Sequence, residues 1–118
     1  NSVALPYYPF NSENNEALKT LQIPNFIMDT NLIKESINEE AILEKAIKLI
    51  EGLEKSKGVA SINWHVRMAY PNDPKLAIYG KIYIEILNYL SKKEDIWVTS
   101  FENYYNWFKK RGNIINEQ

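Results

Sequence analysis

Apolar residues recur at spacings of three and four along two long stretches of the chain, and this spacing predicts two amphipathic helices. The first is expected over residues 39–57, where Asn38 is a suitable N-cap and Gly58 can end the helix in the left-handed conformation. The second is expected to start at Asp73 and Pro74, an N-cap followed by a proline that suits the first turn. Each helix would turn one apolar stripe toward a core.

A third helix is expected after a capping box in residues 99–102, where a hydroxyl at the cap precedes a carboxylate by three positions. It would carry aromatic residues around much of its surface and end at Arg111 and Gly112. Near the amino terminus, residues 3–10 contain two prolines and indicate an extended edge or loop segment. A polar turn is expected after it, in residues 11–15.

Three short apolar runs predict strands, at residues 21–28, 58–65 and 96–98. Each run precedes a helical stretch, and this alternation favours parallel strands joined by right-handed crossovers, hence an α/β fold. Three strands cannot close a barrel, which takes roughly seven or eight. The prediction is an incomplete (β/α) barrel fragment of about three parallel βα units, with an exposed sheet edge.

The length and composition fit one globular unit. The chain has 118 residues, of which 45% are hydrophobic and 25% charged, so residues 1–118 are interpreted as a single domain with one modest core. Because the chain begins at Asn1 rather than at a methionine, we expect a processed product or an excised fragment. No run of about 18 apolar residues and no signal-peptide pattern is present, so no membrane partner is predicted and no compartment is assigned.

The charge balance argues against a nucleic-acid partner. Lysine and arginine number 14 against 15 acidic residues, which leaves a formal net charge of −1 and no general attraction to polyanions. The absence of cysteine excludes disulfides, thiol catalysis and zinc–thiolate sites. Three Trp, eight Tyr and four Phe are expected mainly to fill the core, although aromatic rings also stack on sugars in carbohydrate-binding clefts.

His65 is the only histidine in the chain and the leading candidate for chemistry. It stands at the carboxyl end of the second predicted strand, where the sites of parallel α/β proteins are built. Period-two alternation places Asn63 on the side of His65 and Trp64 on the other side. Asp29 ends the first predicted strand, so its carboxylate could meet the imidazole and hold its orientation. The alternatives are a structural surface histidine and an aspartate that only caps the following turn.

A metal site within this chain is not predicted, because such a site needs about three converging ligands. The sequence has one histidine and no cysteine, and it carries no HExxH pattern, phosphate loop or serine elbow. Several carboxylates lie on predicted helical surface, where solvation is the simpler expectation: Glu39, Glu40, Glu44 and Glu51.

A family resemblance is carried by short segments taken in order. They are Ile27-Met28-Asp29-Thr30, Asn38-Glu39-Glu40-Ala41, Ile62-Asn63-Trp64-His65, Trp97-Val98-Thr99-Ser100, Trp107-Phe108 and Arg111. In order and spacing they resemble the carboxyl-terminal half of polysaccharide deacetylases of the NodB-homology family. The similarity covers most of the chain from Leu21 onward.

The resemblance implies a distorted (β/α) barrel of about seven strands and a metal-dependent hydrolysis of N- or O-acetyl groups on sugars. In that family, an amino-terminal Asp-Asp motif and a His-x-x-x-His motif supply the catalytic base and the metal ligands. A later histidine, supported by an aspartate, is the general acid for the leaving group. His65 matches that histidine and Asp29 its support. We assign substrate contacts to the neighbours of His65, namely Asn63, Trp64, Arg67 and Tyr70.

Two features depart from the family pattern. The metal motifs are absent from this chain, and Asn63 stands where the family usually has an apolar residue that lines the acetate pocket. We therefore expect part of a deacetylase-like hydrolase of acetylated carbohydrate that supplies the general acid but is inactive alone. A divalent metal, expected to be zinc, would be bound in the complete protein and not by this chain.

The expected protein partner is either the missing amino-terminal barrel half or a second copy that pairs across the exposed sheet edge. The alternative function is a non-catalytic carbohydrate-binding or assembly module with a degenerate deacetylase fold.

Overall fold

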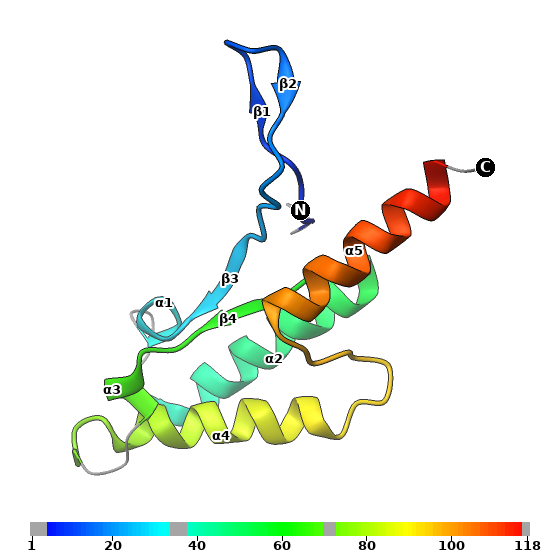
Figure 1. The fold of residues 1–118 in the computed structure, drawn as a ribbon. Helices are drawn as coiled ribbons and strands as arrows, with labels where there is room; N and C mark the ends of the chain where they lie inside the picture. The colour runs from blue at the N-terminus through cyan, green and yellow to red at the C-terminus, as the bar shows by residue number, and fades with distance from the viewer. Residues whose placement is uncertain (1–4, 34–37, 70–72, 117–118) are drawn as a thin grey trace.

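The computed structural model describes residues 5–33, 38–69 and 73–116 as a small chain of mixed helix and strand (Figure 1). Its elements, in order, are β1 (Phe10–Asn11), β2 (Glu16–Ala17), β3 (Asn25–Met28), α1 (Asp29–Ile33), α2 (Glu39–Ser56), β4 (Ser61–Asn63), α3 (Val66–Ala69), α4 (Ala77–Ser91) and α5 (Phe101–Asn116). β1 and β2 form an antiparallel hairpin, while β3 and β4 form a separate parallel pair.

The parallel pair is the centre of the fold. Its register joins Asn25 to Ser61, Ile27 to Ile62 and Met28 to Asn63. Phe26 is therefore an extra residue in β3, which makes a bulge there. The Ser61 hydroxyl is tied to the same region, because it donates a hydrogen bond of 2.6 Å to the carbonyl of Pro24.

The core lies between this pair and two helices. α2 and α4 are on the same side of β3 and β4 and pack against each other (Figure 1). Apolar side chains that face one another across this layer are nearly inaccessible: Ile27, Leu32, Ile42, Ala46, Ile50, Ile82, Ile86 and Leu90. The periodic apolar stripes of the sequence thus form one continuous core.

The prediction of a third strand is wrong. Residues 96–98 are not in a strand, and the two other predicted strands are shorter than expected. A short run becomes a strand only where another strand offers hydrogen-bond partners. Here Ile96 packs against the core, whereas Trp97 and Val98 are exposed. The expected three parallel βα units are therefore reduced to a two-stranded parallel sheet.

α2 is close to its prediction except at its end. Asn38 is the N-cap, and its side chain accepts hydrogen bonds from the backbone N–H groups of Glu40 and Ala41. The left-handed residue is Lys57, with φ 55°, rather than the predicted Gly58. The helix ends one residue early, and the N–H groups of Lys57 and Gly58 bond back to its last turn in a Schellman arrangement.

Substituting Lys57→Gly should raise the free energy of unfolding by about 0.5–1 kcal/mol. Glycine adopts the left-handed conformation without the Cβ clash, and part of this gain is offset by its freedom in the unfolded chain. Urea denaturation measures the change. The matched control, Lys55→Gly, places the same substitution inside the last helical turn and should destabilise by about 0.5–1 kcal/mol. Equal effects at the two positions would contradict the assigned backbone conformation.

The predicted start of α4 is also displaced. Asp73 caps a preceding turn, where it accepts hydrogen bonds from the N–H of Lys75 at its side chain and from the N–H of Leu76 at its carbonyl. The helix itself begins at Ala77, and its N-cap Leu76 has no side-chain cap. The residues after His65, expected to be loop, include the short helix α3.

The boundaries of α5 differ at both ends. Ser100 rather than Thr99 caps the helix, because its hydroxyl accepts a hydrogen bond from the N–H of Asn103. The helix continues through Gly112, where a stop was expected. Glycine lowers helix propensity but does not remove a backbone hydrogen bond, so Gly112 is accommodated inside the helix.

Candidate functional site

The candidate site is formed where β3 and β4 end side by side. Asp29 follows β3 directly as the first residue of α1, and His65 comes two residues after β4. Because the strands are parallel and paired, both residues are delivered to the same edge of the sheet. Residues 36 positions apart in the sequence therefore meet in space.

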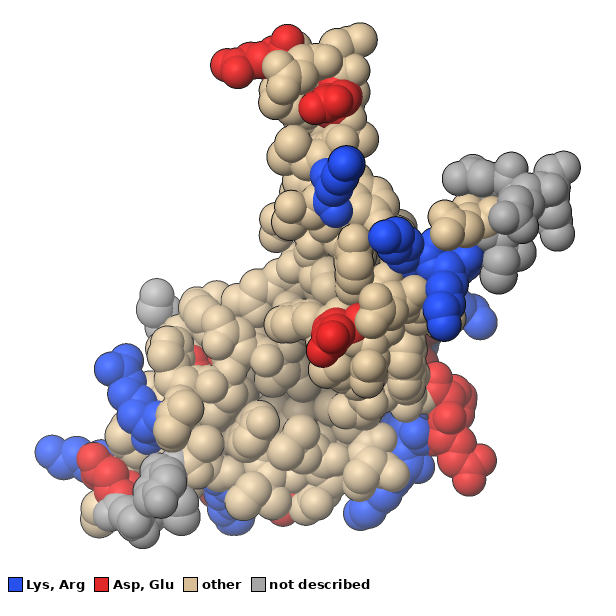
Figure 2. All heavy atoms as spheres, viewed as in Figure 1, with Lys and Arg blue, Asp and Glu red and all other residues tan. Residues whose placement is uncertain are grey.

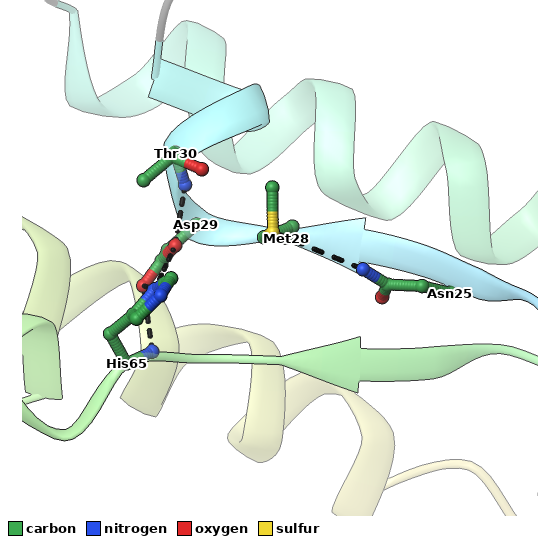
Figure 3. A network of polar contacts seen from close by, with 5 residues as sticks. All are labelled: Asn25, Met28, Asp29, Thr30 and His65. Atoms are coloured by element: carbon green, nitrogen blue, oxygen red, sulfur yellow. Dashed lines mark hydrogen bonds and ion pairs between the residues drawn. The ribbon is translucent and has the colours of Figure 1, made fainter.

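The two side chains are in direct contact (Figure 3). The imidazole Nδ1 of His65 lies 2.9 Å from Oδ1 and 3.0 Å from Oδ2 of Asp29. The backbone N–H of His65 donates a further hydrogen bond of 2.8 Å to Oδ2, and the N–H of Thr30 donates one of 2.6 Å to Oδ1. The carboxylate thus both caps the turn that follows it and holds the histidine, which combines the two predicted roles.

Burial and hydrogen bonding act in opposite directions on Asp29. Its side chain is completely buried, and burial alone would raise the pKa of the carboxyl group. Hydrogen bonds from the backbone and ring of His65 and from the backbone of Thr30 outweigh burial, so the pKa of Asp29 lies below its ordinary value of 3.8. The carboxylate is therefore ionised at neutral pH.

The ionised carboxylate decides which ring nitrogen of His65 carries a proton. An ionised carboxylate only accepts hydrogen bonds, so Nδ1, within 3.0 Å of both its oxygens, must be the protonated nitrogen. The other nitrogen, Nε2, has no hydrogen-bond partner among the described residues, and the side chain is 43% exposed. Nε2 is thus the ring atom that can exchange a proton with a bound molecule.

The predicted substrate-contact residues lie in different surroundings. Asn63 is exposed at the end of β4, and Arg67 is exposed on α3 just after His65. Trp64 is half-buried and stacks on Tyr83 of α4, with ring centroids 5.2 Å apart, so it packs against the core. Tyr70 lies outside the described residues.

Sequence reasoning missed a backbone donor to Asp29 and the close approach of α3 to α4 at Gly80. The backbone N–H of Thr30 donates a hydrogen bond to the Asp29 carboxylate. Because almost every residue type has a backbone N–H, the sequence does not indicate this contact. Gly80 is buried in α4 where α3 crosses it, and a glycine within an apolar helical stripe is the signal that could have indicated a close approach.

The residues of this site do not fit a metal centre. Among the described residues, no group of three or more His, Cys, Asp or Glu side chains converges. The Asp29–His65 pair supplies at most one free ligand atom at Nε2, because Nδ1 is engaged by the carboxylate.

A cavity beside β3 is formed by residues other than the Asp29–His65 pair. Its volume is about 300 Å³, it lies between β3, α1 and α2, and it is lined by Phe26, Ile27, Met28, Asn31, Leu32, Lys45 and Leu49. The side chain of His65 is partly exposed.

Helices that combine the length and the apolar character needed to cross a bilayer are not found in the part of the chain that the structure describes.

Comparisons with protein-family models, with curated proteins and with solved structures give no match to this chain.

Proposed function

We propose that this chain is the carboxyl-terminal part of a carbohydrate deacetylase-like hydrolase, in which His65 is the general acid and Asp29 its support. The observation that supports the proposal is the Asp29–His65 contact at the carboxyl ends of two paired parallel strands. The resemblance of the surrounding segments to polysaccharide deacetylases names the reaction class and acetylated carbohydrate as the substrate.

The chemistry assigned to the chain is one proton transfer. When the carbon–nitrogen or carbon–oxygen bond of the acyl group breaks, the leaving atom needs a proton. Nε2 of His65 can deliver it from the imidazolium form, in which both ring nitrogens are protonated, and the ring is left as the Nδ1–H tautomer bonded to Asp29. Asp29 fixes the ring through Nδ1, so that Nε2 points away from the carboxylate toward solvent. The water activation expected of the family's metal belongs to protein outside the described residues.

The surface of the chain supports a larger assembly. Its radius of gyration is 17.0 Å, against about 13.5 Å for a compact domain of this length. Its accessible surface is 8993 Å², about 2,400 Å² more than a compact monomer of this mass exposes. Each strand of the parallel pair has an unpaired edge among the described residues, where strands of a missing barrel half or of a second copy would add.

A largely uncharged face also supports a larger assembly. Figure 2 shows lysines, arginines and acidic residues mostly around the rim of the molecule and on the hairpin, with a broad, largely uncharged area over the middle. Faces depleted of charge are typical of the core of a protein interface. We therefore propose that the partner covers this face.

A second candidate function is a glycan-binding or assembly module, and one cluster of rings favours it. Trp97 contacts Tyr104 and Trp107 of α5, with centroids 6.3 and 5.9 Å apart, and both tryptophans are exposed. Exposed aromatic rings can stack on sugars. Under this alternative, loss of Trp97 would weaken glycan binding, whereas loss of His65 would not.

In a form of the protein that includes the metal-binding half, His65→Gln is expected to reduce kcat by roughly 100-fold or more, with little change in KM. Glutamine keeps hydrogen-bonding capacity but cannot deliver a proton, so a loss confined to kcat identifies the proton donor. Steady-state deacetylation of acetylated chito-oligosaccharides is the measurement. Arg67 lies in α3, just after His65. Arg67→Gln should instead raise KM if Arg67 contacts substrate.

The 118-residue chain alone should not hydrolyse these substrates, even with added zinc. Zinc-dependent turnover by the isolated chain would contradict the proposal that this chain supplies only the general acid. An upstream coding sequence without Asp-Asp and His-x-x-x-His motifs would favour the binding module instead.

A further inference from the structure

α4 holds the chain on both sides of His65. On the amino-terminal side, the indole of Trp64 stacks on Tyr83, with an angle of 29° between the ring planes. On the carboxyl-terminal side, α3 crosses α4 at the buried Gly80, where an added Cβ would lie 3.0 Å from the carbonyl oxygen of Ala69. Gly80 and Tyr83 are three residues apart in the helix and therefore share a face.

The contact at Gly80 reaches His65 through backbone hydrogen bonds. The N–H groups of Met68 and Ala69 donate to the carbonyl of His65, at 2.8 and 3.2 Å. α3 is thus attached directly to the histidine, and the height at which it sits over α4 sets the position of the His65 carbonyl. A side chain at position 80 would push α3 outward, because the atom it meets first belongs to backbone.

Two other polar groups of His65 are held by Asp29. Its backbone N–H and its ring Nδ1 both bond to that carboxylate, which is fixed at the start of α1. A displacement of α3 or of Trp64 would therefore change the distance or the angle between the imidazole and the Asp29 carboxylate. The close approach at Gly80 and the stacking of Trp64 on Tyr83 are the contacts through which α4 would transmit such a displacement.

We propose that Gly80 and Tyr83 are positioning residues, which fix the direction in which His65 presents Nε2. The catalytic consequence rests on the proposed function, because it matters for turnover only if His65 is the general acid. The contact itself does not depend on the reaction, so it can be measured without substrate.

The test uses the single histidine of the chain, whose ring ¹⁵N resonances need no assignment. Recorded on the alkaline plateau, where they no longer change with pH, these resonances report which nitrogen of the neutral ring carries the proton. The wild-type chain should be mainly in the Nδ1–H form. Gly80→Val and Tyr83→Leu should each shift the tautomer ratio several-fold toward Nε2–H, because the bond to Asp29 is weakened.

Two controls separate positioning from general damage. Gly52→Ala also adds a methyl group to a helical glycine, but nothing lies within 4 Å of the new atom, so the tautomer ratio should not change. Tyr83→Phe keeps the ring under Trp64 and should restore the wild-type ratio. Circular dichroism confirms that each variant is folded.

If Gly80→Val does not fold, Gly80→Ala replaces it, since a contact at 3.0 Å requires α3 to move only slightly. A measurable shift with this variant supports the proposal. Folded Gly80 and Tyr83→Leu variants with the wild-type tautomer ratio would overturn it. A shifted ratio in a protein that proves to have no deacetylase activity would leave this positioning role standing and reject only the proposed function.

Discussion

Replacing Asp29 by alanine is expected to lower the free energy of unfolding by about 2–4 kcal/mol. The carboxylate is completely buried and accepts hydrogen bonds from the backbone N–H groups of Thr30 and His65 and from the imidazole. Alanine would leave these donors without an acceptor at a site that is only partly open to water. Urea denaturation followed by circular dichroism measures the loss.

Two variants serve as controls for this prediction. Asp29→Asn keeps the size of the side chain and one acceptor oxygen, so it should lose roughly half as much stability. Asp95→Asn removes a carboxylate from an exposed turn and should change the free energy of unfolding by less than about 0.5 kcal/mol. If Asp29→Ala unfolds at the same urea concentration as the wild type, the hydrogen bonds described here are not formed.

The same carboxylate makes the stability depend on pH. Because the pKa of Asp29 is lower in the folded chain than its ordinary value of 3.8, ionisation stabilises the folded state. This contribution is fully present above that ordinary value and disappears as pH falls through the lower folded pKa. The unfolding free energies of the wild type and Asp29→Asn should therefore converge below pH 3.8, and a constant difference across that range would reject the pKa assignment.

The helices were the part of the fold that the sequence predicted best. The bounds of α2 follow from its apolar spacing and the cap at Asn38, both of which are local properties. The ends that were wrong were decided by local contacts that more than one arrangement of the same residues could make. Asp73 caps a separate turn before α4, and Lys57 takes the left-handed position one residue before the glycine expected there.

The strands were harder to predict because pairing decides them. Residues 61–63 and 25–28 pair with each other, whereas residues 96–98 have similar β-forming side chains but find no partner strand among the described residues. The antiparallel β1–β2 hairpin was expected only as an extended segment and a turn. Its strands are two residues long, too short for any alternation to be seen.

The contact between Asp29 and His65 could be anticipated, whereas its supports could not. Strand ends of a parallel pair meet at one edge, and this rule places the two residues together without coordinates. The stacking of Trp64 on Tyr83 and the crossing of α3 at Gly80 depend on how α4 is rotated about its axis. That rotation is set by packing. The spacing of apolar residues identifies which face of the helix is buried, but not its exact rotation.

Substituting Ile86→Ala in α4 is expected to reduce the free energy of unfolding by about 3 kcal/mol. The side chain is completely buried in the hydrophobic core, so alanine removes its apolar contacts and leaves a cavity in a small core. The matched control is Ile84→Ala in the same helix, where the side chain is 56% exposed. It should change stability by less than about 0.5 kcal/mol, because alanine also has the higher helix propensity.

The difference between these two positions measures the rotation of α4 about its axis. Ile86 faces the core in the same helix whose Gly80 and Tyr83 meet the chain beside His65. Urea denaturation of both variants, with the slope of the transition compared as well as its midpoint, gives the two losses directly. Equal losses at Ile84 and Ile86 would mean that α4 is rotated from the orientation described. Gly80 would then no longer face α3, and the support of His65 would have to come from other residues.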